Sequence, residues 1–209
     1  MSNPRIIVSH EKKLIIVNNY KAGFATLNHA LNKNEAISVE NPNTLKEIQP
    51  LSDYRKVLFF REPVARFISF LNDKVILGRG NSENLNKLIR FSGGDAILPE
   101  LERVRRNEHP DRVGFIEELI EYLSPVLHLD GHTVPQHMIY TRHGADLDFF
   151  DTIHDYTFNT AFLKQEFGLD VPVRNQTGSK QLFDTLMTPK VKAFCSVWYA
   201  VDLAHFARL

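Results

Sequence analysis

A lysine and an arginine each follow a short apolar run in a pattern that favours anion binding. Lys21 comes shortly after residues 14–17 (LIIV), and Arg61 comes directly after residues 56–60 (KVLFF). A loop between a strand and a helix offers backbone N–H groups and the positive end of the helix dipole to an anion. An arginine fork and a hydroxyl, here Arg61 and Ser69, can hold a phosphate through charge-assisted hydrogen bonds. The two elements together predict one ligand with two anionic ends.

Strand-to-helix junctions must position these side chains. The β-branched run 14–17 is typical of a buried strand, Gly23 eases the backbone through the loop, and a helix is expected from Thr26. After the second apolar run, Pro63 suits the first position of a helix over 64–77. This alternation predicts a parallel α/β sheet, which binds ligands at the carboxyl ends of its strands. The first junction is not a Walker A motif, because its lysine precedes its glycine.

The rest of the chain predicts elements that surround this sheet. Residues 5–8 form either a hairpin or a neighbouring strand with the first apolar run. Four arginines at 103, 105, 106 and 112 are expected on a solvated helix face. The other expected elements are a weak strand at 36–39, helices at 44–48 and 82–91, a helix over 115–123 capped by Asp111, a strand at 149–154, a helix at 160–167 ended by Gly168, and a final helix at 190–207. We expect one domain over 1–209, with a helical insertion near 82–124.

Composition bounds the class of protein. The 209 residues suit one domain, and 25 Lys and Arg balance 25 Asp and Glu, so no global field favours nucleic acid or an anionic membrane. Cys195 is the only cysteine, which excludes an intrachain disulfide and disfavours a cysteine-based metal site. No signal-peptide layout and no membrane-spanning run are seen, and we expect a cytoplasmic protein without an integral membrane segment.

Several motifs resemble the sulfotransferases that use 3′-phosphoadenosine 5′-phosphosulfate (PAPS), specifically the carbohydrate sulfotransferase branch. The family's strand-K-x-G-helix element stands here as N-Y-K-A-G-F-A-T at 19–26, and its R-[DE]-P-x-x-R-x-x-S element is matched in full at 61–69. Three further landmarks follow in the family's order: H-x-x-P-Q at 132–136, N-x-[ST] at 175–177 and Y-x-x-D-x-x-x-F at 199–206. The resemblance therefore touches nearly the whole chain.

The resemblance implies a fold related to P-loop nucleotide kinases and the transfer of a sulfuryl group from PAPS to a hydroxyl, on a carbohydrate. It implies a 3′-phosphate site formed by Arg61 and Ser69. Lys180, in the polar loop 175–180, either reaches a phosphate or belongs to a solvated turn. The residues implied to cradle the 5′-phosphosulfate are Lys21, Ala22, Gly23, Phe24, Ala25 and Thr26.

The implied mechanism is in-line attack of the acceptor hydroxyl on sulfur, with no metal. Lys21 would stabilise the charge on the departing phosphate, and a general base would take the hydroxyl proton. His132, in the H-x-x-P-Q motif, is the first candidate for that base; His128, His137 and Glu62 are its rivals. The chain resembles a bacterial-type soluble relative.

Two other interpretations stay open. Phe24 and Ala25 stand where the family usually has small or hydroxyl residues, so a binding protein without transfer activity is one alternative. A nucleotide or small-molecule kinase is the other, although such an enzyme should carry a Walker A motif and metal-binding acids.

Overall fold

The two predicted strand-to-helix junctions follow neighbouring strands of one four-stranded sheet. The computed structural model describes residues 5–19, 22, 24–32, 34, 38–79, 82–142, 144–171 and 184–208. In these residues the strand order is β1-β2-β3-β4, with antiparallel pairing of β1 and β2 and parallel pairing of β2 with β3 and of β3 with β4. The strands are β1 (Arg5–Ser9), β2 (Leu14–Asn18), β3 (Arg55–Phe60) and β4 (Thr152–Asp155). The mixed α/β class and the parallel centre are confirmed, and the first two strands form a hairpin.

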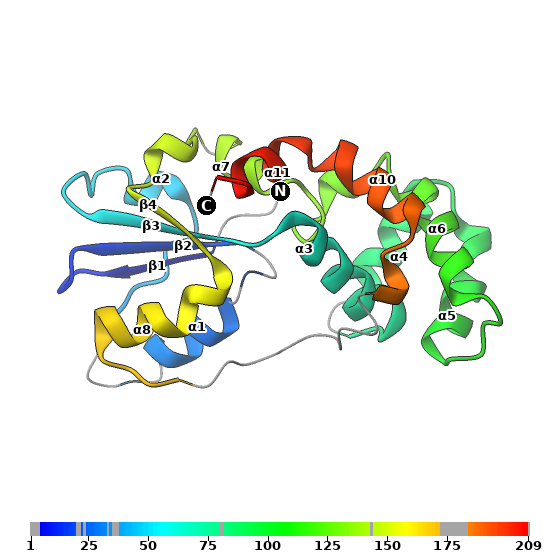
Figure 1. Ribbon diagram of the computed structural model, residues 1–209, viewed down its shortest axis with the longest axis horizontal. Helices are drawn as coiled ribbons and strands as arrows, with labels where there is room; N and C mark the ends of the chain where they lie inside the picture. The colour runs from blue at the N-terminus through cyan, green and yellow to red at the C-terminus, as the bar shows by residue number, and fades with distance from the viewer. Residues whose placement is uncertain are drawn as a thin grey trace. The chain divides into compact units, whose positions relative to one another are not determined.

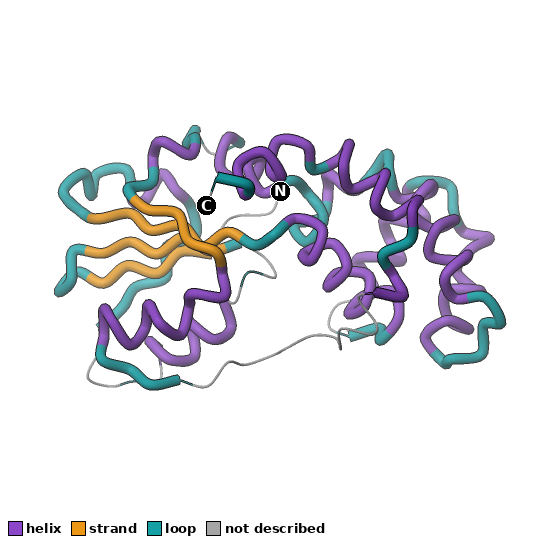
Figure 2. The backbone as a smooth tube through the Cα atoms, viewed as in Figure 1, coloured by secondary structure: helices purple, strands orange, loops and turns teal. Residues whose placement is uncertain are grey.

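The chain divides into two compact units. We call Ser2–Pro63, Pro135–Gln176 and Val201–Leu209 the sheet unit, and Val64–Val134 with Thr177–Ala200 the helical unit. All described strands, orange in Figure 2, belong to the sheet unit.

Two helices cover one face of the sheet, α1 (Phe24–Asn32) and α8 (Asn159–Phe167), which lie together in Figure 1. Every residue of β2 is buried, as its β-branched sequence predicts. Alternate strand residues Ile16, Val57 and Phe59 pack against Leu27 and Phe162 of these helices. This apolar layer fixes the carboxyl end of β2 relative to the start of α1.

Short helices lie on the other side of the sheet in Figure 1: α2 (Leu45–Ile48), α7 (Gln136–Thr141) and α11 (Ala200–Phe206). The rings of Phe60 and Phe206 stack there with centroids 6.3 Å apart. The last strand residue of β3 is thereby packed just before the chain reaches Arg61.

The described residues of the helical unit contain helices and loops only. Its α-helices are α3 (Pro63–Phe70), which leads in from the sheet unit, α4 (Ser82–Phe91), α5 (Leu98–Arg105), α6 (Arg112–Leu123) and α10 (Pro189–Trp198). A π-helical segment, Leu71–Ile76, continues α3. The ring of Phe67 lies 5.3 Å from that of Phe194 and 6.0 Å from that of Tyr199, so α3 and α10 share an aromatic core.

Most predicted elements are confirmed close to their expected bounds. Pro63 begins α3, and the Asp111 carboxylate accepts the Gly114 N–H (2.8 Å) to cap α6. Gly168 ends α8 in the left-handed conformation (φ 69°) that favours glycine. Three of the four arginines expected on a solvated helix face make contacts inside the helical unit: Arg103 with Glu100, Arg105 with Glu102 and the Lys74 carbonyl, and Arg112 with Asn107.

Three boundaries differ from the prediction. The single last helix is wrong: α10 and α11 are separated at Tyr199, whose φ of −108° and ψ of 21° leave the helical region while its hydroxyl donates to the Thr133 carbonyl. The strand expected from 149 starts at Thr152, because the Asp146 carboxylate accepts the Phe149 N–H and closes a turn. Helix α1 begins at Phe24, not Thr26.

Residues 35–37 of the weak strand lie outside the described residues, and Glu40 makes a bridge with Val8. The helices over 82–124 are present, and their status as an insertion stays a prediction.

Candidate functional site

The first junction runs from β2 into α1. Lys21 and Gly23 lie outside the described residues, as does Lys180. Ala22 is buried, Thr26 is buried within α1, and Phe24 and Ala25 form the beginning of that helix. The first N–H groups of a helix have no intrahelical partner, so the backbone at 24–26 offers donors to an anion irrespective of its side chains.

Three buried asparagines at this end of the sheet hold amide atoms for which the described residues provide no hydrogen-bond partner. For Asn18, which is fully buried, these atoms are both Nδ2 and Oδ1. The Oδ1 atoms of Asn19 and Asn159 are in the same condition, although Asn159 Nδ2 donates to the Ala22 carbonyl (3.4 Å). Buried amides of this kind are typical of positions that water or a polar ligand fills. The carboxyl end of β2 therefore fits a polar ligand.

The second junction runs from β3 into α3 and carries Arg61. This residue is half-buried, and its guanidinium lies 4.7 Å from the ring centroid of Tyr156. Stacking on an aromatic ring restrains an arginine while its N–H groups stay directed outward from the ring. Since Asn18 of β2 pairs with Phe59 of β3, the two junctions follow neighbouring parallel strands, as predicted.

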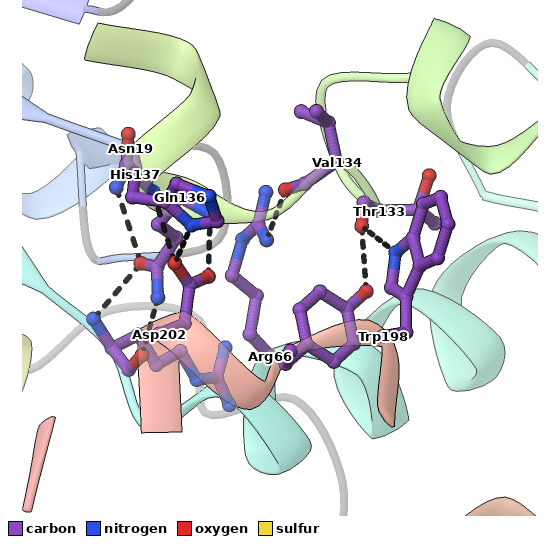
Figure 3. Close-up of polar contacts among 10 residues, drawn as sticks. Asn19, Arg66, Thr133, Val134, Gln136, His137, Trp198 and Asp202 are labelled. Atoms are coloured by element: carbon purple, nitrogen blue, oxygen red, sulfur yellow. Dashed lines mark hydrogen bonds and ion pairs between the residues drawn. The ribbon is translucent and has the colours of Figure 1, made fainter. Parts of the chain in front are cut away.

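Gln136 makes hydrogen bonds to both junctions (Figure 3). Its Oε1 accepts from Asn19 Nδ2 at 3.2 Å and from the Arg61 N–H at 3.1 Å, and its Nε2 donates to the Arg61 carbonyl at 2.7 Å. The residue is fully buried at the start of α7. One side chain thus bonds to the loop after β2 and to the loop after β3.

Asp202 of α11 fixes the start of α7. Its buried carboxylate accepts the N–H groups of Gln136 (2.5 Å) and His137 (3.0 Å), which caps the helix. The same carboxylate lies 2.7 Å from His137 Nδ1. This contact favours the tautomer in which Nδ1 carries the proton and Nε2 accepts one.

In the helical unit, Arg66 and Ser69 of the R-E-P-x-x-R-x-x-S motif are both buried. Arg66 Nη1 donates to the Val134 carbonyl at 2.8 Å and Nη2 to the Gly131 carbonyl at 2.7 Å. Arg66 therefore holds the loop that contains His132. Burial of Ser69, 2% exposed, rules out the solvated helix position that a serine usually occupies.

His132 pairs with Asp130 within that loop. Its Nδ1 lies 2.7 Å from Asp130 Oδ1, which also accepts the His132 N–H at 2.6 Å. Burial works to raise the pKa of Asp130, but the hydrogen bond and the charge of His132 outweigh it and hold that pKa below 3.8. A carboxylate at Nδ1 favours the tautomer in which Nδ1 carries the proton and Nε2 the lone pair, which is the form that a general base requires. His128, by contrast, is exposed.

The described site residues fall in both units. Ala22, Thr26 and Arg61 belong to the sheet unit, whereas Ser69 and His132 belong to the helical unit.

Comparison with models of protein families gave a match over most of the chain. The model of the sulfotransferase family matches residues 8–193, which is most of the chain. This chain belongs to the sulfotransferase family. Searches of curated proteins and of solved structures gave no match. The sulfotransferase match includes both junctions, the H-x-x-P-Q motif and the 175–177 loop. Membership makes the protein a transferase, with transfer of sulfuryl groups as its general activity.

Several residues that link the two junctions to each other, or hold Arg61 and α7 in place, had no role predicted from the sequence. Asn19, Gln136 and Asp202 lay inside quoted motifs without an assigned function, and Tyr156 had no signal at all. The motifs were the only available clue, because contacts such as Gln136 to Arg61 join residues far apart in the chain.

Of the helices that the structure describes, none has the length and apolar character needed to cross a membrane.

Proposed function

We propose that this sulfotransferase uses PAPS as its donor and a carbohydrate hydroxyl as its acceptor. The observation that carries the proposal is the pair of strand-to-helix junctions after β2 and β3, joined by Gln136. PAPS has anionic groups at both its 5′ and its 3′ end, which matches two such elements. The choice of a carbohydrate rests on the motif resemblance to the carbohydrate branch.

The junction after β2 is the proposed site of the 5′-phosphosulfate. Lys21 supplies the positive charge, and the backbone of Gly23, Phe24, Ala25 and Thr26 supplies N–H donors. Ala22, whose own N–H donates to the Asn19 carbonyl (3.2 Å), lines the loop in this proposal. The start of α1 at Phe24 supports this assignment, because backbone donors there replace the hydroxyls that the family usually has. The Asn18 amide and the Asn19 Oδ1 atom, for which the described residues provide no partner, support a polar ligand at the same end of the sheet.

The junction after β3 is the proposed site of the 3′-phosphate. Arg61 and Ser69 are its proposed ligands, and Lys180 is a further phosphate contact in this proposal. The placement of the Arg61 guanidinium on Tyr156 supports the role, since a restrained arginine loses less entropy on binding.

In the proposed reaction the acceptor oxygen attacks sulfur in line, forming an S–O bond as the bond from sulfur to the 5′-phosphate oxygen breaks. The electron pair goes to the leaving adenosine 3′,5′-bisphosphate, whose charge Lys21 stabilises. His132 Nε2 takes the acceptor proton, supported by its pairing with Asp130. His137, paired with Asp202, is the rival base. No metal takes part in this scheme.

We also propose that residues 1–209 form one sulfotransferase domain. The continuous family match over 8–193, which includes segments of both units, supports this.

The test is a transfer assay with PAPS and a panel of saccharides, followed by mass spectrometry of the products, with ATP and Mg²⁺ in parallel. We expect a sulfated saccharide from PAPS, formed in equal amount to adenosine 3′,5′-bisphosphate. His132→Ala should lower the rate about a hundredfold or more without changing donor affinity, and His128→Ala is its matched control. A phosphorylated product from ATP, or full transfer by Lys21→Ala, would refute the assignment.

A further inference from the structure

We propose that Gln136 is a positioning residue that holds the two anion-binding junctions at one spacing, so that both ends of a single nucleotide bind together. The proposal rests on the proposed function, because it takes the loops after β2 and β3 as the two phosphate sites. It adds a property of that site: the contributions of the two phosphates to binding depend on each other through one buried amide.

The contacts of Gln136 use both ends of its amide on the two loops. The oxygen receives one hydrogen bond from Asn19, two residues before Lys21, and one from the backbone of Arg61. The amide nitrogen returns a hydrogen bond to the Arg61 carbonyl at 2.7 Å. The backbone of Arg61 is therefore hydrogen-bonded at both its N–H and its C=O, which fixes the position from which its side chain projects.

The side chain of Gln136 is itself held in place. It is fully buried, so bulk solvent does not compete for these hydrogen bonds. Asp202 accepts its backbone N–H and that of His137, which fixes the first turn of α7. The clamp, meaning Asn19, Arg61, Gln136 and Asp202, is therefore built from residues of one unit.

An apolar side chain of the same size would fill the space at Gln136, but it would leave Asn19 Nδ2 and the N–H and carbonyl of Arg61 without this partner. The amide is therefore what links the two loops. A buried glutamine whose side chain makes three hydrogen bonds to two proposed ligand-binding loops is typical of preorganisation, in which the loops are ordered before the ligand binds. A ligand with two phosphates gains from a fixed spacing between the loops, whereas a ligand with one phosphate does not.

Two variants separate this role from general stability. Gln136→Met keeps the length and the volume of the side chain and removes all three hydrogen bonds. Asn19→Ala removes only the link to the loop after β2 and leaves both bonds to Arg61. Gln165→Met makes the same chemical change at an exposed position of α8 and serves as the control.

The measurement is calorimetric affinity for three probes: adenosine 3′,5′-bisphosphate, adenosine 5′-phosphate and adenosine 3′-phosphate. In Gln136→Met and in Asn19→Ala we expect the bisphosphate to lose about tenfold in affinity, a loss typical of one or two buried hydrogen bonds. Each monophosphate should lose less than about threefold. Amide hydrogen exchange without ligand should quicken at Arg61 in Gln136→Met and stay unchanged in Asn19→Ala.

An equal loss for all three probes, or no loss for any, would overturn the clamp. If Gln136→Met does not fold, Asn19→Ala decides the matter by the same criterion. Failure of the wild-type protein to bind the bisphosphate would instead overturn the proposed function, and the clamp with it. Hydrogen exchange at Arg61 that is the same in Gln136→Met and wild type would refute the clamp irrespective of any ligand.

Discussion

Two histidines of this sulfotransferase each pair with a carboxylate through Nδ1, His132 with Asp130 and His137 with Asp202. Each pair directs Nε2 toward proton acceptance. The pairs differ in origin, because Asp130 is two residues from its histidine whereas Asp202 comes from a distant helix. The two carboxylates also differ in what they hold, since Asp202 caps α7 while Asp130 contacts the histidine and the rest of its own loop. We therefore keep His132 as the proposed base.

The pairing of Asp130 with His132 makes a prediction about pKa. In the wild type the pKa of Asp130 is below 3.8, because His132 outweighs the effect of burial. In His132→Ala burial remains as the largest influence, and the pKa should rise above that value. Carbon-13 NMR titration of the carboxyl group checks this. A pKa that stays low in the variant would assign the effect to the backbone N–H of residue 132, which the variant keeps, and to Lys74 instead of the imidazole.

The proposed role of Arg61 makes a prediction about selectivity. Arg61→Ala should weaken adenosine 3′,5′-bisphosphate about tenfold to a hundredfold, since a hydrogen bond from a charged group contributes about 1.5–3 kcal/mol. Adenosine 5′-phosphate, which lacks the 3′ group, should be almost unaffected. Calorimetry on both ligands provides the measurement, with Arg103→Ala of the exposed α5 surface as control. Equal weakening of the two nucleotides would remove Arg61 from the 3′-phosphate site.

Side chains from α3 and from the end of α10 hold the loop at 130–134 through its carbonyl groups. Arg66 of α3 binds its carbonyls at 131 and 134, and Trp198 and Tyr199 both donate to the Thr133 carbonyl, at 3.1 and 2.6 Å. These donors come from α3, from the last residue of α10 and from Tyr199 directly after it, and the ring of Tyr199 also contacts that of Phe67. The fold of the helical unit thereby determines where His132 lies.

Removal of the Arg66 donors should be costly. In Arg66→Met two buried carbonyls lose charged donors, and we expect the free energy of unfolding to fall by about 3 kcal/mol. Urea denaturation measures this change. Arg103→Met, which breaks only an exposed pair, should change stability by less than about 0.5 kcal/mol. A similarly small effect at Arg66 would mean that the loop is held by other contacts.

The elements that the sequence predicted well are those with local signals. Proline at the start of α3, aspartate before α6 and glycine after α8 act within a turn of the residues they affect. The division between α10 and α11 had no such signal, because apolar spacing continues through Tyr199 and the interruption depends on a contact with Thr133. The same holds for the candidate site. Arg61 and His132 could be predicted because they lie in local motifs, whereas the hydrogen bonds of Gln136 and Asp202 join distant parts of the chain and could be seen only in the folded structure.

The stability of the protein should depend on the protonation of His154 in β4. Its ring centroid lies 4.7 Å from that of Phe158 and 5.8 Å from that of Phe59. Burial, and after it the charge of Arg55, lowers the pKa of His154 below 6.5, while Glu166 partly opposes this. The folded state therefore favours the neutral imidazole. The resulting stabilisation is complete above the ordinary pKa and is lost as pH falls through the lowered one.

We expect the unfolding midpoint of the wild type to fall between about pH 7 and about pH 5 more steeply than that of His154→Phe. The variant keeps an aromatic ring against Phe59 and Phe158 and removes the titrating group. Thermal unfolding at several pH values compares the two proteins. Parallel curves would show that other groups govern acid stability in this range.

The central claim is that this sulfotransferase binds a nucleotide with phosphates at both ends, and calorimetric titration tests it without knowledge of the acceptor. Adenosine 3′,5′-bisphosphate should bind at one site per chain and at least about tenfold more tightly than ATP or adenosine 5′-phosphate, because only the bisphosphate carries the 3′ group that Arg61 is proposed to bind. Preference for ATP would contradict the account in favour of a kinase, and absence of binding by all three nucleotides would contradict both.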